Sequence, residues 1–286
     1  MRLAMISTAA GNRLCTARDG KFIDLNGVDP TIPACLKGLL ADEKGIEKAR
    51  AAADKGWQAS KFVDGRILAP ISRPGKVICI GLNYRDHAAE SGMEPPPEPV
   101  VFNKFPQTVI GPEELIKIPA VCKEVDYEAE LVAVIGKKGR RIPKADALQY
   151  VAGYMNGNDV SARDWQIHKP GKQWLLGKTP DTFAPCGPWL VTADEVPQPE
   201  NLGIRLRLNG QTLQNSTTKE LIFGIAELVA YVSQITTLEP GDLIFTGTPP
   251  GVGMARKPPI FLKPGDVCEV EIDGLGVLKN SVVADD

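Results

Sequence analysis

The chain has 286 residues, a formal net charge of −2 and an isoelectric point near 5.9. Charge this balanced offers no basic surface to a nucleic acid or a lipid membrane, so neither is expected as a partner. The apolar run within residues 1–6 is far shorter than the about 20 residues that a helix needs to cross a bilayer. Because Asp19 and Asp24 interrupt the early sequence, no organellar transit peptide is predicted, and the expected location is cytoplasmic.

The six cysteines form no metal-binding or redox motif. They are irregularly spaced, without a C-x-x-C pair, and several lie in apolar runs, as Cys79 does. A chain of this size does not need disulfides for stability. Buried, reduced thiols are therefore expected, with three disulfides as the less favoured alternative.

Residues 1–70 are predicted to form a small α+β domain. Leu3–Ser7 is typical of a strand, and Arg13–Leu25 predicts a hairpin whose turn lies at Asp19-Gly20. The stretch Leu36–Ala53 is rich in Ala, Lys and Glu, which favours a helix. Nothing in this unit indicates chemistry, because it contains no histidine and its acidic residues have the pattern of solvated groups.

The domain boundary is expected at residues 70 and 71, inside the Pro- and Gly-containing stretch Leu68–Gly75. Beyond it, residues 71–286 contain short apolar runs separated by Gly and Pro, which indicates a β-rich domain. Hairpin turns are predicted at Asn209-Gly210 and Asp273-Gly274, and a helix over Lys219–Gln234. The predicted strands are Lys76–Ile80, Val100–Lys104, Leu131–Ile135, Ile204–Leu208, Leu243–Phe245 and Val267–Ile272.

Three carboxylates are the strongest candidates for a metal site. Glu128 and Glu130 lie two apart in a run that is typical of a strand, so both are expected on one face. Buried like charges are costly unless something neutralises them, and a hard cation such as Mg²⁺ takes oxygen ligands. Asp159 follows the apolar run Tyr150–Tyr154 and could supply a third oxygen. The alternative is that the two glutamates face solvent on an edge strand.

The chain has only two histidines. His87 follows a predicted buried strand, and in a helix it would share a face with Glu90, three residues later. A carboxylate beside an imidazole raises its basicity, which suits a general base acting on water; the alternative is an exposed pair on a surface helix. His168 lies in a polar stretch with Pro and Gly, where a surface loop without a role is expected.

Two further segments could contact a ligand. Lys178 lies beside Gly177 in a turn-rich stretch and could meet an anionic substrate, although a solvated charge is the simpler interpretation. A phosphate loop is excluded, because Lys172 stands where that motif needs glycine. In Thr246–Gly253, small residues allow close approach of a ligand and hydroxyls could bind a carboxylate, with a plain turn as the alternative.

Taken together, these segments resemble the fumarylacetoacetate hydrolase family, over residues 72 to 283. The stretch Lys172–Thr179 is especially similar to the branch of fumarylacetoacetate hydrolase domain-containing protein 2. The matching strings occur in the family's order: Gly81–His87, Pro99–Lys104, Asp126–Leu131, Asn158–Asp164, Gly177–Lys178, Asp181–Phe183, Gly187–Trp189 and Thr246–Gly253.

The resemblance implies an α+β, β-rich fold whose mixed sheets roll into a pseudo-barrel, and a homodimer. It implies Mg²⁺ or Mn²⁺ held by Glu128, Glu130 and Asp159. His87 and Glu90 would form the water-activating dyad, and Lys178 would stabilise negative charge. The remaining implied roles are substrate-binding ones, for Arg163, Gln166 and Thr248.

The leading functional hypothesis is hydrolysis of a carbon–carbon bond in acylpyruvate-type 2,4-diketo acids. Water activated by His87 would attack the distal carbonyl and expel a pyruvate enolate, whose charge the metal and Lys178 could hold. The alternative is keto–enol tautomerisation or decarboxylation of oxaloacetate at the same site. A hypothesis of another class is a catalytically silent scaffold that binds metal or ligand, which the presence of His87, Glu90 and Lys178 disfavours.

Overall fold

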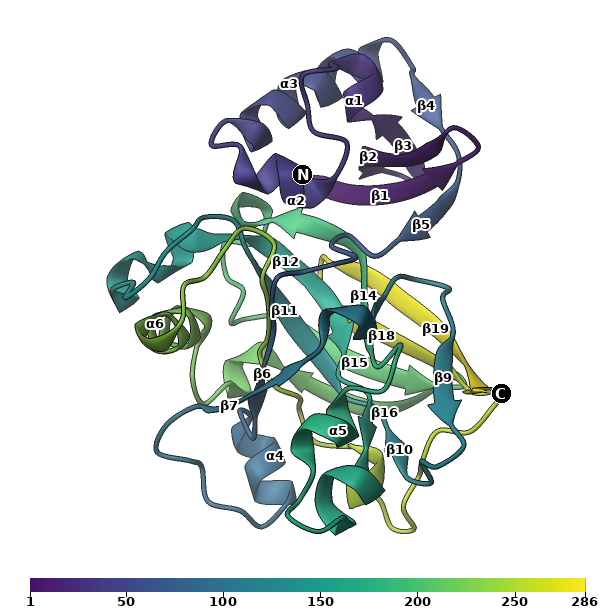
Figure 1. Ribbon diagram of the computed structural model, residues 1–286, viewed down its shortest axis with the longest axis vertical. Coiled ribbons are helices and arrows are strands. Elements are labelled where there is room, and N and C mark those ends of the chain that lie inside the picture. The colour runs from purple at the N-terminus through teal and green to yellow at the C-terminus, as the bar shows by residue number, and fades with distance from the viewer. Residues whose placement is uncertain (286) are drawn as a thin grey trace.

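A computed structural model describes residues 1–285 of the chain, with six α-helices and nineteen strands in that range (Figure 1). The helices are α1 (Leu25–Val28), α2 (Leu36–Ala41), α3 (Gly45–Gln58), α4 (Arg85–Glu90), α5 (Trp174–Lys178) and α6 (Ile225–Ile235). The first strands are β1 (Arg2–Thr8), β2 (Gly11–Arg18), β3 (Lys21–Asp24), β4 (Phe62–Val63), β5 (Arg66–Leu68), β6 (Val77–Gly81), β7 (Val100–Lys104), β8 (Val109–Ile110) and β9 (Ile116–Pro119). The others are β10 (Val125–Asp126), β11 (Ala129–Ile135), β12 (Val151–Asn158), β13 (Ser161–Ala162), β14 (Ala184–Thr192), β15 (Gly203–Leu208), β16 (Gln211–Thr217), β17 (Leu243–Phe245), β18 (Val267–Ile272) and β19 (Gly276–Asp285).

The N-terminal unit matches most of its prediction. β1, β2 and β3 form an antiparallel meander, and the β2–β3 turn places Asp19 at φ 49° and Gly20 at φ 73°, as a two-residue hairpin turn of this sequence does. The predicted single helix is divided into α2 and α3. The reason is a close approach at the break, where a Cβ on Gly45 would lie 2.0 Å from the carbonyl oxygen of Leu39.

The largest sheet runs through both predicted domains. Its strand order is β4-β3-β2-β1-β14-β12-β11-β17-β6-β7, with β5 beside β1 and β8 beside β14. β1 joins the two parts by pairing antiparallel with β14 (Figure 1). In this pairing Arg2 lies opposite Val191. The division near residue 70 therefore stays a prediction, because main-chain hydrogen bonds cross it.

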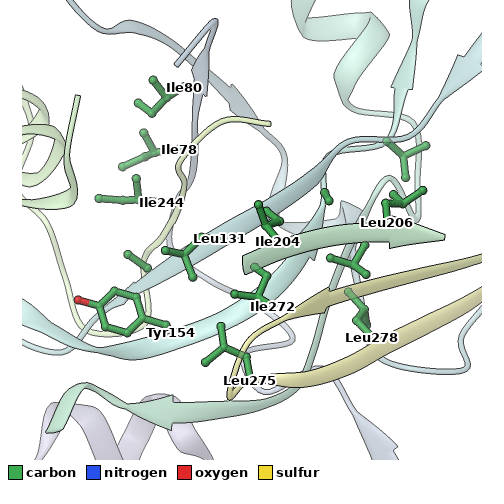
Figure 2. Packing of buried hydrophobic residues seen from close by; sticks show 14 of the residues in the cluster. Ile78, Ile80, Leu131, Tyr154, Ile204, Leu206, Ile244, Ile272, Leu275 and Leu278 are labelled. Atoms are coloured by element: carbon green, nitrogen blue, oxygen red, sulfur yellow. The ribbon is translucent and has the colours of Figure 1, made fainter. Parts of the chain in front are cut away.

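A second sheet has the order β16-β15-β18-β19-β9. It packs on the large one, with contacts of β15, β18 and β19 to β11, β12 and β14. In β15 and β18 every second residue is buried, which is the pattern of a sheet with one face on the core. Figure 2 shows Leu131 of the large sheet beside Ile204 and Ile272 of the second. The predicted class, α+β and β-rich with mixed sheets, is confirmed, and the hydrogen-bonded strand order of residues 1–285 does not close on itself.

The helix predicted over Lys219–Gln234 is shorter than expected. It begins only at Ile225, after a 3₁₀ turn at Thr218–Glu220 and an irregular stretch. The cause is the buried Asn83, whose side chain accepts a hydrogen bond from the main-chain N–H of Phe223 and donates one to the carbonyl of that residue. These bonds satisfy the main chain of Phe223 outside a helix.

The cysteines are free, and all except the exposed Cys35 are buried, as predicted. Within residues 1–285, no helix combines the length and the apolar composition that a membrane crossing requires.

Candidate active site

The three candidate carboxylates meet where β11 begins and β12 ends. Glu130 is the second residue of β11, and Asp159 follows the last residue of β12. Glu128 lies just before β11, outside the strand predicted for it, and its carbonyl accepts a hydrogen bond from the N–H of Asp159 at 2.9 Å. One carboxylate oxygen from each residue lies within 4.8 Å of the others, and all three residues are buried. The alternative of a solvent-facing pair is excluded.

Lys178 is the first of three cations that contact this cluster. The ammonium of Lys178 donates to Glu128 Oε2 at 2.9 Å and to Asp159 Oδ2 at 2.8 Å. Burial alone would lower the pKa of Lys178, but Asp159 and Glu128 outweigh it and hold that pKa above its ordinary value. Lys178 is therefore a charged, buried donor and not the solvated lysine of the simpler interpretation.

Arg163 is the second cation, and its guanidinium lies between two buried carboxylates. It donates to Asp126 Oδ2 and Glu128 Oε1, at 2.9 and 2.6 Å, and also to Gln166 Oε1 at 2.9 Å. Burial would raise the pKa of Glu128, but Lys178 and Arg163 outweigh it and lower that pKa to about 2. Glu128 is thus ionised at neutral pH.

Glu130 has the opposite electrostatic environment. Burial, followed by the charges of Asp159 and Glu128, raises the pKa of its carboxyl well above the ordinary value. The main-chain N–H of Gly247 opposes this by donating to Glu130 Oε2 at 2.7 Å. Gly247 has a φ of 103°, which favours glycine, and an added Cβ would lie 2.7 Å from Asn83. A carboxyl in this position ionises more readily when a cation arrives, which suits a metal ligand.

Sequence reasoning missed three buried polar residues that hold this cluster. Lys104, at the end of β7, contacts Asp159 Oδ1 at 2.6 Å. Asp126 accepts from Arg163 and from the main-chain N–H groups of Gly253 and Met254. Lys104 and Asp126 both lie inside strings that carry the family resemblance, and that was the one available signal for them.

Gln214 is the third missed residue. From β16, its side chain accepts from the N–H of Ala129 at 2.8 Å and donates to the hydroxyl of Thr248 at 2.9 Å. The Thr248 hydroxyl in turn donates to the carbonyl of Ala129 at 2.9 Å. Its single proton is therefore engaged, so toward a ligand this hydroxyl can only accept.

His87 and Glu90 do form a pair on a helix. Both belong to α4, and His87 Nδ1 lies 3.2 Å from Glu90 Oε2. The N–H of Gly251 donates to both carboxylate oxygens of Glu90 at 3.0 Å, which fixes that carboxylate. One glycine of the Thr246–Gly253 segment therefore orients the predicted dyad.

A single cavity of about 410 Å³ unites most of the predicted residues. Residues of α4 and α5 line it, and Figure 1 shows these two helices at the end of the molecule opposite the N-terminal unit. Asp159 is fully buried and does not line the cavity itself, but it accepts a hydrogen bond from Lys178, which does. The polar lining consists of His87, Glu90, Ser91, Glu128, Glu130, Arg163, Gln166, Lys178 and Thr248, and the apolar lining includes Ile80, Phe102, Trp174 and Met254.

His168 lies outside this cavity, and 64% of its side chain is exposed. It ends a short helical turn, Asp164–His168, and not the loop that was expected. The same turn buries Gln166, because Gly177 packs against it so closely that an added Cβ would lie 2.7 Å from Gln166.

The donor set fits a divalent cation. It consists of three carboxylate oxygens close enough to share one ion, with no sulfur or nitrogen among them. Mg²⁺ and Mn²⁺ are cations that prefer such oxygen ligands.

The sequence profile described as "Fumarylacetoacetate (FAA) hydrolase C-terminal" matches residues 76–283. The mitochondrial oxaloacetate tautomerase fahd2 of Xenopus laevis is 51% identical over 265 residues, which cover 92% of this chain and 83% of that protein. The mitochondrial oxaloacetate tautomerase FAHD2A of Homo sapiens is 48% identical over 269 residues, 94% of this chain and 86% of that one. A solved fumarylacetoacetate hydrolase from Exiguobacterium antarcticum superimposes with a TM-score of 0.84 at 33% identity, over all of both chains. The chain belongs to the fumarylacetoacetate hydrolase family, as the sequence motifs predicted.

These relatives correct one prediction. The cytoplasmic location expected from the sequence is contradicted, because both tautomerases are named as mitochondrial proteins. Two acidic residues near the start of a chain, Asp19 and Asp24, are therefore a poor indicator of its cellular location.

Proposed function

We propose that this protein is an oxaloacetate keto–enol tautomerase. The observation that carries the proposal is the buried ammonium of Lys178 at the wall of a cavity that also contains His87. The relatives that are 51% and 48% identical to this chain are named oxaloacetate tautomerases. Acylpyruvate hydrolysis, favoured from the sequence alone, becomes the second candidate.

The reaction moves one proton from carbon 3 of the oxo acid to the oxygen on carbon 2. In the proposed mechanism, His87 removes the carbon-bound proton, and the electron pair of that bond forms the carbon–carbon double bond of the enolate. The carboxylate of Glu90, 3.2 Å from Nδ1 of the imidazole, would hold the ring in the orientation that this transfer needs. Return of the proton to oxygen completes the enol and restores neutral His87.

Lys178 would stabilise the enolate oxygen. Its ammonium stays protonated because Asp159 and Glu128 raise its pKa, and it is held in place before the substrate arrives. A divalent cation on Glu128, Glu130 and Asp159, which we propose to be Mg²⁺ or Mn²⁺, would supply a Lewis acid that polarises the 2-oxo group.

Gln166 would orient the substrate. Its Oε1 accepts a hydrogen bond from Arg163, and its Nε2, which can only donate, needs a different partner from Arg163; Gln166 also lines the cavity. We propose that this N–H binds a substrate carboxylate or carbonyl. Arg163 would act through Glu128 and Gln166, since most of its N–H groups are already bound to protein.

The test is a parallel assay of purified protein with Mg²⁺ and with a chelator, following decay of enol-oxaloacetate and pyruvate release from acylpyruvates. Fast, metal-dependent enol decay is expected, and His87→Ala should lower its rate by about 10²–10⁴-fold. His168→Ala is the matched control, because this second histidine is exposed and lies outside the cavity. Unchanged enol decay in His87→Ala would contradict the assigned base.

Hydrolysis remains the second candidate because the His87–Glu90 pair also suits activation of water, and the solved relative from Exiguobacterium antarcticum is named for that reaction. Metal-dependent pyruvate release without fast enol decay would move the assignment to the hydrolase.

We also propose a homodimer, formed at the edge of the large sheet. β7 ends that sheet and exposes Val100 and Val101, and α5 beside it exposes Leu175 and Leu176. Exposed apolar side chains on an edge strand favour association with another strand. Light scattering after size exclusion should give twice the chain mass, and Val101→Lys should shift it to the monomer. A monomeric wild type would refute the proposal.

A further inference from the structure

Lys104 is a buried cation for which the proposed reaction has no use. Its side chain is fully buried, and it does not line the cavity. Its ammonium contacts three oxygens: Asp159 Oδ1 at 2.6 Å, the carbonyl of Val160 at 2.8 Å and the carbonyl of Lys178 at 2.6 Å. The contacts with the two carbonyls are hydrogen bonds, and the contact with Asp159 is an ion pair. A buried charge requires such an ion-pair partner and such hydrogen bonds, and the same contacts fix the positions of the three oxygens.

The first acceptor is one of the candidate metal ligands. Asp159 receives Lys104 on Oδ1 and Lys178 on Oδ2, and its carboxylate is therefore held from both sides. Only Lys178 also lines the cavity, so Oδ2 is the oxygen on the cavity side. The contact with Lys104 thus holds Oδ1 away from the cavity and leaves Oδ2 as the oxygen of Asp159 that faces the cation site.

The other acceptors are main-chain groups that carry the site. Val160 directly follows Asp159, and the carbonyl of Lys178 lies at the end of α5. Phe102, two residues before Lys104 and on the same face of β7, places its ring 5.0 Å from the Lys178 ammonium. One strand thus contacts Lys178 at both its ammonium and its carbonyl.

We propose that Lys104 is a positioning residue for the divalent cation: it orients Asp159 and holds the turn that bears Lys178. The inference rests on the cation site proposed above, but not on which reaction the site performs. The proposed role of Lys104 is to orient these groups, and its positive charge by itself would not favour a bound cation.

The two effects of this lysine on a cation have opposite signs. A positive charge beside the ligands repels Mg²⁺, so removal of that charge alone would tighten binding. Loss of a group that orients a metal ligand typically weakens binding by about 10–100-fold. In addition, without Lys104 the buried Asp159 would depend on Lys178 alone, which would draw that ammonium further onto the ligand oxygens. We therefore expect weaker binding.

The experiment is titration calorimetry of Mg²⁺ into the metal-free protein, for wild type, Lys104→Met and Lys76→Met. Lys76→Met is the matched control, because Lys76 also contacts a fully buried carboxylate, that of Asp242, at 2.8 Å. Neither Lys76 nor Asp242 lines the cavity. Lys104→Met should raise the Mg²⁺ dissociation constant by at least about 10-fold. Lys76→Met should lower the melting temperature but keep the wild-type dissociation constant.

Equal or tighter Mg²⁺ binding by folded Lys104→Met would overturn the inference and leave the cation site intact. No Mg²⁺ binding by the wild type would overturn the cation site itself, and the inference with it. If Lys104→Met does not fold, Lys104→Gln keeps N–H donors for the two carbonyls but not the charge, and it should still bind Mg²⁺ at least about 10-fold more weakly. Wild-type affinity in that variant would equally refute the role.

Discussion

Arg163 and Arg207 each lie between two carboxylates, Arg163 in the candidate active site and Arg207 on the solvent-facing side of the second sheet. Arg163 contacts its partners at 2.9 and 2.6 Å, with 6% of its side chain exposed. Arg207 contacts its partners at 3.3 and 2.7 Å, with 25% exposed. Both arginines thus contact two carboxylates within ion-pair distance, but Arg163 is far more deeply buried than Arg207.

The difference lies in what remains when the arginine is removed. The partners of Arg207, Glu269 and Glu271, are partly exposed on β18, so water can solvate them. The partners of Arg163, Asp126 and Glu128, are buried. An ion pair in the first setting contributes little, whereas loss of one member in the second leaves charge without solvent. Burial, more than distance, therefore decides what these two ion clusters contribute.

The largest expected effect is that of Arg163→Met. It leaves two buried carboxylates without this partner, and it should lower the free energy of unfolding by about 3–5 kcal/mol. Urea unfolding of the metal-free protein measures this change. A loss below about 1 kcal/mol, the range of exposed pairs, would erase the distinction between the two arginines.

A smaller effect is expected in the pH dependence of that loss. The pKa of Glu128 is lowered from an ordinary value of 4.5 to about 2. Ionised Glu128 therefore contributes its full stabilisation of the folded state when the pH is above 4.5. This contribution disappears as the pH falls through the folded-state pKa. The difference in unfolding free energy between wild type and Arg163→Met should therefore narrow between about pH 5 and about pH 2.

Urea unfolding at several pH values, with a chelator present, tests this narrowing. The raised pKa of Glu130 has the opposite influence on stability, but it is shared by both proteins and largely cancels in the difference. A difference that grows toward low pH would show that Arg163 does not act through the ionised carboxylates.

The smallest expected effect is that of Arg207→Met, which should change the free energy of unfolding by about 0–1 kcal/mol. Salt should reduce even this difference, because the charges are accessible to solvent. Urea unfolding at low and high sodium chloride gives both numbers. A loss as large as that of Arg163→Met would mean that solvent does not replace the lost partner of Glu269 and Glu271.

Local sequence patterns predicted much of this fold. The strands of β15 and β18 and the turn at Asp19-Gly20 follow from alternation and turn chemistry, which are properties of neighbouring residues. The late start of α6 was not predictable, since it depends on Asn83, more than 100 positions away in the chain.

The candidate site was predictable in part for the same reason. Glu128 and Glu130 attract notice because two acids in an apolar run are locally unusual. Lys104 and Gln214 do not, because each is unremarkable beside its neighbours and gains its contacts only from segments distant in sequence. Lys104 lies in Pro99–Lys104, one of the strings that carry the family resemblance, but the string does not indicate which groups its ammonium contacts.

The pairing of β1 with β14 has a consequence for protein engineering. Any chimera that exchanges the first 70 residues with those of a relative must supply a strand that fits the register of Arg2 with Val191 and Leu3 with Leu190. A crossover placed in the stretch 68–75 would separate the halves in sequence but not in hydrogen bonding. Recombination of this chain should therefore succeed or fail according to the compatibility of that strand pair, and not according to the composition of the linker.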